Sequence, residues 1–245
     1  MCVYVAITGA SSGIGRALAL AVPFEQVTLM TVGRRRAEVG EWVEADLATP
    51  ASWPRVSARF AAAMSGRRYD RAVFLHFAGV GSPHATTVEA SLDDYTAAVL
   101  LNAGAGPVLG KAFLSACRAV RVPATVVMCS SPGAATPMPG MSHYGSGKLG
   151  MEYWVRAVAA EYPDCDDVRA IAVVPFAVDT PMVREVIDQP ADLQPVAALL
   201  RAAAARGELA SAESTAAEIW QLVVGGVRSG TVMPVGAVPP ELRGA

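Results

Sequence analysis

The sequence is poor in charge. Lys, Arg, Asp and Glu make up 17% of its 245 residues, whereas hydrophobic residues make up 53%, and the formal net charge is −2. A chain with so few and so scattered basic residues lacks the electrostatic footprint of a nucleic-acid-binding protein. The composition instead suits a parallel sheet covered by helices on both faces, whose strands are apolar on both sides.

Cysteine and histidine are also scarce. Cys2, Cys117, Cys129 and Cys165 show no C-x-x-C spacing and do not cluster with the three histidines. This pattern argues against a zinc site and a disulfide framework, and it favours a reducing compartment. No apolar run approaches the ~18 residues of a membrane span, and expected structure begins at residue 3, which leaves no room for a signal segment. We therefore expect a cytoplasmic protein without metal, nucleic-acid partner or membrane partner.

Hydrophobic periodicity predicts alternating strands and helices, and no linker rich in Pro, Gly or Ser divides the chain. Apolar runs predict strands at 2–8, 27–32, 41–45, 72–77, 124–130, 169–174 and 231–235. Helical spacing predicts helices at 14–22, 52–65, 91–118, 144–161 and 213–224. The alternation predicts one α/β domain over 1–245, with a doubly wound, seven-stranded parallel sheet flanked by helices, in the order 3-2-1-4-5-6-7. Pro107 should bend or loosen the long fourth helix just beyond Asn102.

A glycine-rich turn, Gly9-Ala-Ser-Ser-Gly13-Ile-Gly15, links the first expected strand to the first helix. Glycines at this spacing let the backbone approach a pyrophosphate, and a helix N-terminus offers free N–H groups to the phosphates. The turn therefore predicts a Rossmann fold with a dinucleotide at the switch point between strands one and four. We expect the cofactor to contact Gly9, Ser11, Ser12, Gly13, Ile14 and Gly15.

Tyr144 and Lys148 stand four residues apart, with Ser131 thirteen residues upstream of the tyrosine. One helical turn separates Tyr144 from Lys148, so both side chains project from one face, where an ammonium would lower the tyrosine pKa. Ser131 ends an apolar run and should lie at the carboxyl end of a strand, where open α/β sheets bind ligands. Ser130 is the alternative, because side chains alternate between the two faces of a strand.

In order along the chain, Thr8-Gly-Ala-Ser-Ser-Gly-Ile-Gly15, Asn102, Ser131 and Tyr144-Gly-Ser-Gly-Lys148 resemble the short-chain dehydrogenase/reductase family. The resemblance covers essentially the whole chain. Further matches are Asp46-Leu47, Ala78-Gly79 and Pro175-Phe-Ala-Val-Asp-Thr180-Pro-Met182. The long segment after Thr180 looks most like the sepiapterin reductase and benzil reductase branch.

The resemblance implies a role for each matched residue. Tyr144 would be the general acid in carbonyl reduction or the general base in alcohol oxidation, and Lys148 would lower its pKa and bind the nicotinamide ribose. Ser131 would hydrogen-bond the substrate oxygen, and Asn102 would hold a water that relays protons to Lys148, unless it only satisfies the helix kink. Further expected cofactor contacts are Asp46 at the adenine, Thr180 at the carboxamide, and Leu47, Ala78, Gly79, Pro175 and Val178. Asp46 could instead simply start a turn.

Two positions depart from the family pattern. His76-Phe77 stand where two asparagines are usual, and Phe176 replaces a glycine after the sixth strand. We expect His76 to be a core residue and Phe176 to narrow the pocket. A substrate lid at about 176–212 should provide an apolar lining suited to an aromatic ketone or a diketone. The expected substrate residues are Ser131, Met138, Tyr144, Phe176 and Met182, with Arg184 as a possible anchor for an acidic group.

The loop after the second strand predicts the cofactor. No acidic residue stands at or near Gly33 to bind a ribose diol, and Arg34 lies where a guanidinium can bind a 2′-phosphate. We therefore expect an NADPH-dependent carbonyl reductase. The alternatives are a solvated turn at Arg34, an NAD-linked alcohol dehydrogenase, and a non-catalytic dinucleotide sensor. Self-association as a homodimer or homotetramer is expected through small and apolar residues of the fourth and fifth helices: Gly104, Gly106, Gly147, Gly150, Met151 and Trp154.

Overall fold

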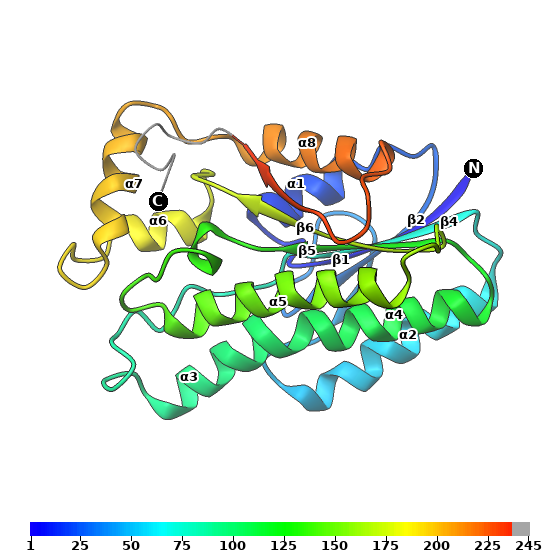
Figure 1. Ribbon diagram of the computed structural model, residues 1–245, viewed down its shortest axis with the longest axis horizontal. Coiled ribbons are helices and arrows are strands. Elements are labelled where there is room, and N and C mark those ends of the chain that lie inside the picture. The colour runs from blue at the N-terminus through cyan, green and yellow to red at the C-terminus, as the bar shows by residue number, and fades with distance from the viewer. Residues whose placement is uncertain (237–245) are drawn as a thin grey trace.

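The computed structural model describes residues 1–236 and contains one seven-stranded parallel sheet (Figure 1). The strands are β1 (Cys2–Thr8), β2 (Gln26–Gly33), β3 (Glu41–Glu44), β4 (Arg71–His76), β5 (Ala124–Cys129), β6 (Val168–Pro175) and β7 (Val232–Val235). Their order is β3-β2-β1-β4-β5-β6-β7, which confirms the predicted doubly wound topology. The last part of the domain predicted over 1–245, residues 237–245, lies outside the described residues.

Helices cover both faces of the sheet. One face carries α2 (Trp53–Gly66), α4 (Gly106–Ala119) and α5 (Ser142–Glu161), and the other carries α1 (Gly13–Leu20) and α8 (Ala212–Val224) (Figure 1). Strand β1 shows why both layers form. Tyr4 and Ala6 lie in one apolar cluster and Val3, Val5 and Ile7 in the other, because successive strand residues point to opposite faces.

The predicted fourth helix is interrupted as Pro107 led us to expect. It consists of α3 (Leu92–Val99), a π-helical turn η2 (Leu100–Ala105) and α4. Pro107 has no N–H, so one carbonyl of the preceding turn lacks its helical donor. Asn102 lies within this π turn, and such turns are common at functional sites.

The same stretch, Leu92–Ala119, has the length and apolar composition of a membrane span. This finding corrects the expectation that nothing in the chain approaches one. Leu109 and Phe113 are fully buried in the core beneath the sheet, so the apolar face is used for packing within the fold.

Helices that the sequence did not predict occupy the lid, residues 176–212. They are α6 (Pro181–Ile187) and α7 (Pro195–Ala205), which lie beyond the carboxyl end of β6 (Figure 1). The hydroxyl of Thr180 accepts a hydrogen bond from the N–H of Val183 and so caps α6. Short 3₁₀ turns, η1 (Pro50–Ser52) and η3 (Pro132–Ala134), follow β3 and β5.

The proposed oligomer face needs correction. A side chain at Gly104 would meet Trp53, one at Gly106 would meet His76, and one at Gly147 would meet the main chain of Asn102. Those three glycines therefore serve close packing inside the chain, as does Met151, which is fully buried. Of the predicted small residues, Gly150 faces open space.

Candidate active site

The structure brings Ser131, Tyr144 and Lys148 together at the carboxyl end of β5. Ser131 lies close enough to Tyr144 to lower the pKa of its hydroxyl. The ammonium of Lys148 lies 5.2 Å from the centre of the Tyr144 ring and donates to the carbonyl of Cys129 over 2.8 Å. All three side chains are buried, which keeps water away from any proton exchanged among them.

The neighbouring serines point in different directions. Ser131 meets Tyr144, and its Oγ accepts a hydrogen bond from the N–H of Gly133 at 3.2 Å. The hydroxyl of Ser130 instead donates to Glu152 over 2.6 Å. The geometry therefore distinguishes the two serines, and Ser131 is the one beside the tyrosine. Sequence reasoning missed Glu152, although its position eight residues after Tyr144 places it on the same helical face.

Burial sets the protonation of this group more strongly than the sequence suggested. Burial raises the pKa of Tyr144, and the nearby Ser131 hydroxyl offsets this only in part. Burial also lowers the pKa of Lys148. The expectation that Lys148 would hold the tyrosine pKa below its usual value is therefore wrong for the protein alone, because the cost of placing a phenolate away from water is larger.

Asn102 is fully buried and holds the main chain of the β4–α3 loop. Its Oδ1 accepts from the N–H of Val80 at 3.0 Å, and its Nδ2 donates to the Val80 carbonyl at 2.9 Å. A side chain at Gly79 would lie 3.2 Å from Asn102 Oδ1 and 3.5 Å from Lys148 Nζ. The asparagine thus fixes the loop that borders Lys148, and the water relay stays a prediction.

The glycine-rich turn is tightly closed. Gly9 has a φ of 73°, a conformation that favours glycine, and a methyl group at Gly15 would lie 2.3 Å from the Gly9 carbonyl oxygen. Ser12 precedes α1 without capping it, and the first turn of α1 carries no acidic side chain. The first N–H groups of α1 therefore remain available to an anion such as a pyrophosphate.

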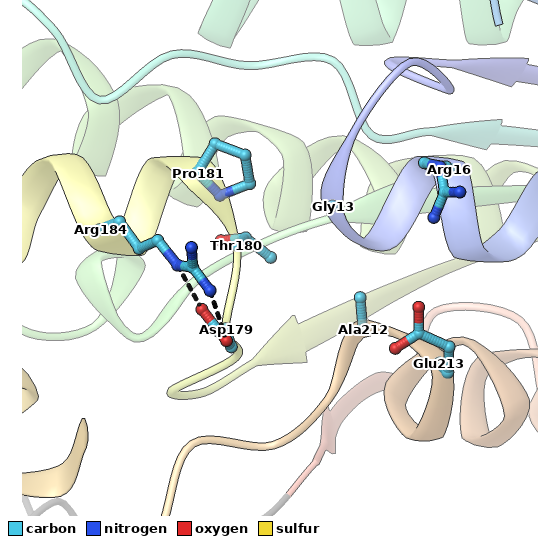
Figure 2. A pocket seen from close by; sticks show the side chains of 8 residues that line it. All are labelled: Gly13, Arg16, Asp179, Thr180, Pro181, Arg184, Ala212 and Glu213. Carbon is cyan, nitrogen blue, oxygen red and sulfur yellow. Dashed lines mark hydrogen bonds and ion pairs between the residues drawn. The ribbon is translucent and has the colours of Figure 1, made fainter. Parts of the chain in front are cut away.

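A cavity of about 260 Å³ adjoins this turn (Figure 2). It is lined by Gly13, Arg16, Asp179, Thr180, Pro181, Arg184, Ala212 and Glu213. Arg184 was considered as a substrate anchor, but its guanidinium binds both oxygens of Asp179, at 2.7 and 2.9 Å (Figure 2). A side chain at Gly13 would lie 3.1 Å from Thr180, so the turn and the start of the lid meet at this cavity.

An ion pair that sequence reasoning missed joins α1 to the loop after β2. Arg16 donates to both carboxylate oxygens of Glu38, at 2.5 and 3.2 Å, and this hydrogen bond lowers the pKa of Glu38. Glu38 is thus an acid in the loop that was expected to have none near Gly33. The side chain of Arg34 is exposed, and among residues 1–236 no acidic group pairs with it.

The remaining predicted cofactor residues lie around the same edge of the sheet. Asp46 is exposed, and its Oδ1 accepts from the N–H of Ala48 at 3.1 Å, so it does start a turn. Leu47 is buried in the core. The N–H of Ala78 donates to the Thr8 hydroxyl over 3.1 Å, and Val178 forms an isolated bridge with Ala210.

His76, which stands where an asparagine was expected, is fully buried, as predicted for a core residue. Its Nδ1 lies 3.0 Å from the Thr8 hydroxyl, which also accepts the N–H groups of Phe77 and Ala78. Because Thr8 already accepts two hydrogen bonds, its own proton points to His76. This arrangement ties β1 to β4 in place of an asparagine.

The lid covers Tyr144 with apolar side chains. Tyr144 and Met141 form one cluster with Val186 of α6 and with Ala197 and Leu200 of α7. Met138 and Met182, both predicted substrate residues, pack against this cluster. Phe176 is half-buried at the end of β6. The reacting groups therefore lie beneath an adaptable apolar cover.

Fold and site together define an oxidoreductase that uses a nucleotide cofactor, because a serine, a tyrosine and a lysine meet beside a phosphate-binding turn. Residues 3–191 match the family of short chain dehydrogenases. The chain therefore belongs to the short-chain dehydrogenase/reductase family, as the sequence motifs predicted, and it is an NAD(P)-dependent oxidoreductase.

One curated relative and two solved structures show what the chain is similar to in sequence and in fold. A benzil reductase that forms (S)-benzoin, from Bacillus subtilis (strain 168), is 28% identical over 181 residues, which cover 72% of this chain and 74% of the reductase. A short chain dehydrogenase/reductase from Saccharomyces cerevisiae has a similar structure, with a TM-score of 0.80 and 20% sequence identity. The match covers 99% of this chain and 98% of the yeast protein. A 4-hydroxyisoleucine dehydrogenase complexed with NADH has a TM-score of 0.79 and 14% sequence identity. The match covers 95% of this chain and 96% of that dehydrogenase.

Proposed function

We propose that the protein is an NADPH-dependent carbonyl reductase that acts on a ketone or diketone, with Tyr144 as general acid. The observation that carries the proposal is the meeting of Ser131, Tyr144 and Lys148 in a buried apolar setting, with Lys148 Nζ 5.2 Å from the centre of the Tyr144 ring. A carbonyl oxygen placed between the two hydroxyls would receive a hydrogen bond from each. The similarity to a benzil reductase supports a carbonyl substrate.

The protonated form of Tyr144 is the form that carbonyl reduction requires. Its pKa is raised by burial, so the phenol keeps its proton at neutral pH and can give it to the substrate oxygen. Oxidation of an alcohol would need the phenolate as a base. Bound NADPH would supply the hydride, and Lys148 would stabilise the negative charge left on Tyr144.

The chain has residues suited to hold this cofactor. The N–H groups at the start of α1 suit the pyrophosphate, and the cavity beside Gly13 and Thr180 provides room. Arg34 is exposed and suits a 2′-phosphate, while the nearby acid Glu38 is neutralised by Arg16. This charge pattern supports NADPH over NADH.

Apolar side chains on α4 and α5 support self-association as a homodimer or homotetramer. On α5, Leu149 is 50% and Tyr153 is 73% exposed, and Val108 of α4 is 42% exposed. Gly150 lies beside the two residues of α5 and would allow close approach of another helix. These side chains replace the inward-facing glycines as the proposed contact face.

Single substitutions test the reaction. Tyr144→Phe should bind NADPH normally and lose ketone reduction by about 10²–10⁴-fold, since it removes only the acidic proton. Ser131→Ala should lose about 10²-fold or more, because a group that stabilises the substrate oxygen is gone. Ser130→Ala is the matched control, since that hydroxyl bonds to Glu152.

Retention of most activity in Tyr144→Phe would contradict the assignment. NADPH binding without turnover, across a panel of aromatic ketones and diketones, would instead favour the dinucleotide sensor. Turnover limited to alcohols with NAD would favour the alcohol dehydrogenase.

A further inference from the structure

Three buried polar atoms without a hydrogen-bond partner belong to residues near the lid. They are Nε2 of His84, Nε2 of His143 and Oε1 of Gln194. Two further buried atoms without a partner within residues 1–236, Oγ1 of Thr31 and Nε2 of His76, belong to the sheet. Unpaired buried polar atoms are uncommon in native proteins, so a group of them calls for a partner. His84 and Gln194 are the informative residues, because they also bond to each other.

His84 and Gln194 are 110 residues apart in the sequence and form a pair in the fold. Gln194 is fully buried just before α7, and its Nε2 lies 2.7 Å from Nδ1 of His84. With the amide as donor, Nδ1 is the acceptor, so the neutral imidazole carries its proton on Nε2. Burial lowers the pKa of His84, with Glu185 opposing it, and keeps the ring in this neutral form.

The pair lies against residues of the lid and of the loops around Tyr144. A methyl group at Gly81 would come within 3.3 Å of Cε1 of His84, 3.4 Å of the Met141 side chain and 3.7 Å of the Met182 side chain. Met141 belongs to the apolar cluster that contains Tyr144, and Met182 packs against that cluster. His84 is therefore a polar group set in the apolar surroundings of the reacting tyrosine.

The neighbouring His143 lies beside the loop that presents His84. It is buried directly before Tyr144; burial lowers the pKa of its ring, and the nearby main chain of Gly81 and Ser82 opposes this effect. A side chain at Gly140 would lie 3.4 Å from Nε2 of Gln194, so the glutamine also contacts the loop that precedes α5. The pair is thus held from three sides, which leaves the N–H of His84 and the Oε1 of Gln194 as fixed polar groups.

We propose that His84 and Gln194 recognise a second oxygen on the substrate, and so make the enzyme selective for 1,2-diketones or hydroxyketones over simple ketones. The reacting carbonyl meets Ser131 and Tyr144, and the second oxygen accepts from Nε2–H of His84 or, as a hydroxyl, donates to Oε1 of Gln194. This inference rests on the proposed carbonyl reduction. It explains why polar atoms without partners are placed among methionines, since a ligand oxygen satisfies them.

The test compares 1-phenyl-1,2-propanedione with 1-phenyl-1-propanone, which lacks the second oxygen, by NADPH consumption. Gln194→Met and His84→Phe keep much of the side-chain volume but remove the polar groups. Each should lower kcat/KM for the dione by about tenfold or more and leave that for the monoketone within about threefold. The dione is intrinsically more reactive, so the ratio of variant to unmodified enzyme is compared for each substrate.

Two controls keep the result interpretable. Gln189→Met removes another lid amide, whose Nε2 donates to the carbonyl of Glu185 in α6, and it should leave kcat/KM for both substrates unchanged. The double variant of His84 and Gln194 should lose little more than either single variant, because the two residues act as one unit. Thermal unfolding and NADPH binding confirm that each variant is folded.

Equal losses on both substrates, or no loss on the dione, would overturn the role of the pair while leaving the reductase assignment intact. Absence of turnover with any carbonyl in the unmodified protein would overturn the proposed function and this inference with it.

Discussion

His76 makes the sheet sensitive to acid. The ring is fully buried on β4, where the Thr8 hydroxyl occupies Nδ1, and Nε2 has no partner within the described residues. Burial, with a smaller contribution from the charge of Lys148, lowers the pKa of His76 to about 3. The unfolded chain binds this proton near pH 6.5, so between pH 6.5 and 3 it holds one more proton than the folded chain. The contribution of neutral His76 to the free energy of unfolding is therefore complete above pH 6.5, and it is lost as the pH falls from 6.5 to 3.

The size of the effect follows from linkage. One such group changes the free energy of unfolding by up to about 1.4 kcal/mol per pH unit, or about 2.5 kcal/mol between pH 6 and pH 4. His76→Asn keeps an acceptor for Thr8 but does not titrate. We expect the variant to be less stable than the unmodified protein at pH 7, because the shorter side chain leaves a void, and to lose less stability on acidification.

Urea unfolding at pH 6, 5 and 4 measures this difference. Exposed carboxylates titrate in both proteins, so their contribution cancels in the comparison. His84→Asn serves as a control with a smaller expected change, since His84 is less buried than His76. If stability falls equally steeply in His76→Asn and in the unmodified protein, His76 has a partner for its proton and the reasoning is refuted.

Two further predictions concern the cofactor and the assembly. Gly33→Asp with Arg34→Ala should shift the NADPH:NADH ratio of kcat/KM by about tenfold or more toward NADH, because a charge-assisted hydrogen bond is replaced by repulsion; equal efficiency with both cofactors in the unmodified protein would contradict this. Tyr153→Glu should dissociate the oligomer in sedimentation at micromolar concentration without changing helix content, since it places a charge in an apolar contact. An unmodified protein that sediments as a monomer would disprove that interface.

The fold could be predicted because apolar runs and helical spacing alternate regularly, and the rules for crossovers leave few topologies. The predicted strands match the observed ones to within one or two residues, for example 72–77 against β4. The lid helices were not predicted. Both are short and begin at prolines, Pro181 and Pro195, so the sequence there indicates a break as readily as a helix start.

Residue spacing identified the site only where the groups share one element or lie on consecutive elements of the chain. Tyr144 and Lys148 lie one turn apart on α5, and the spacing to Ser131 distinguished it from Ser130. The pair of His84 and Gln194 comes from distant loops, which no periodicity connects. The prediction for Gly104, Gly106 and Gly147 is wrong because a small residue looks the same in sequence whether it contacts a neighbouring helix or a neighbouring molecule.

The π turn at Leu100–Ala105 determines how the long helix accepts changes in length. Leu101, Ala105, Leu109, Phe113 and Cys117 are buried at intervals of four, a spacing that drifts by roughly 40° per step around a regular α-helix. The wider π turn absorbs part of that drift and keeps the later residues against the sheet. Removing one residue from the regular helix between this turn and Phe113 would rotate everything after it by roughly 100°, turning Phe113 away from the core. Insertions and deletions in this helix are therefore restricted by the angular alignment of its two halves, even at positions that touch neither cofactor nor substrate.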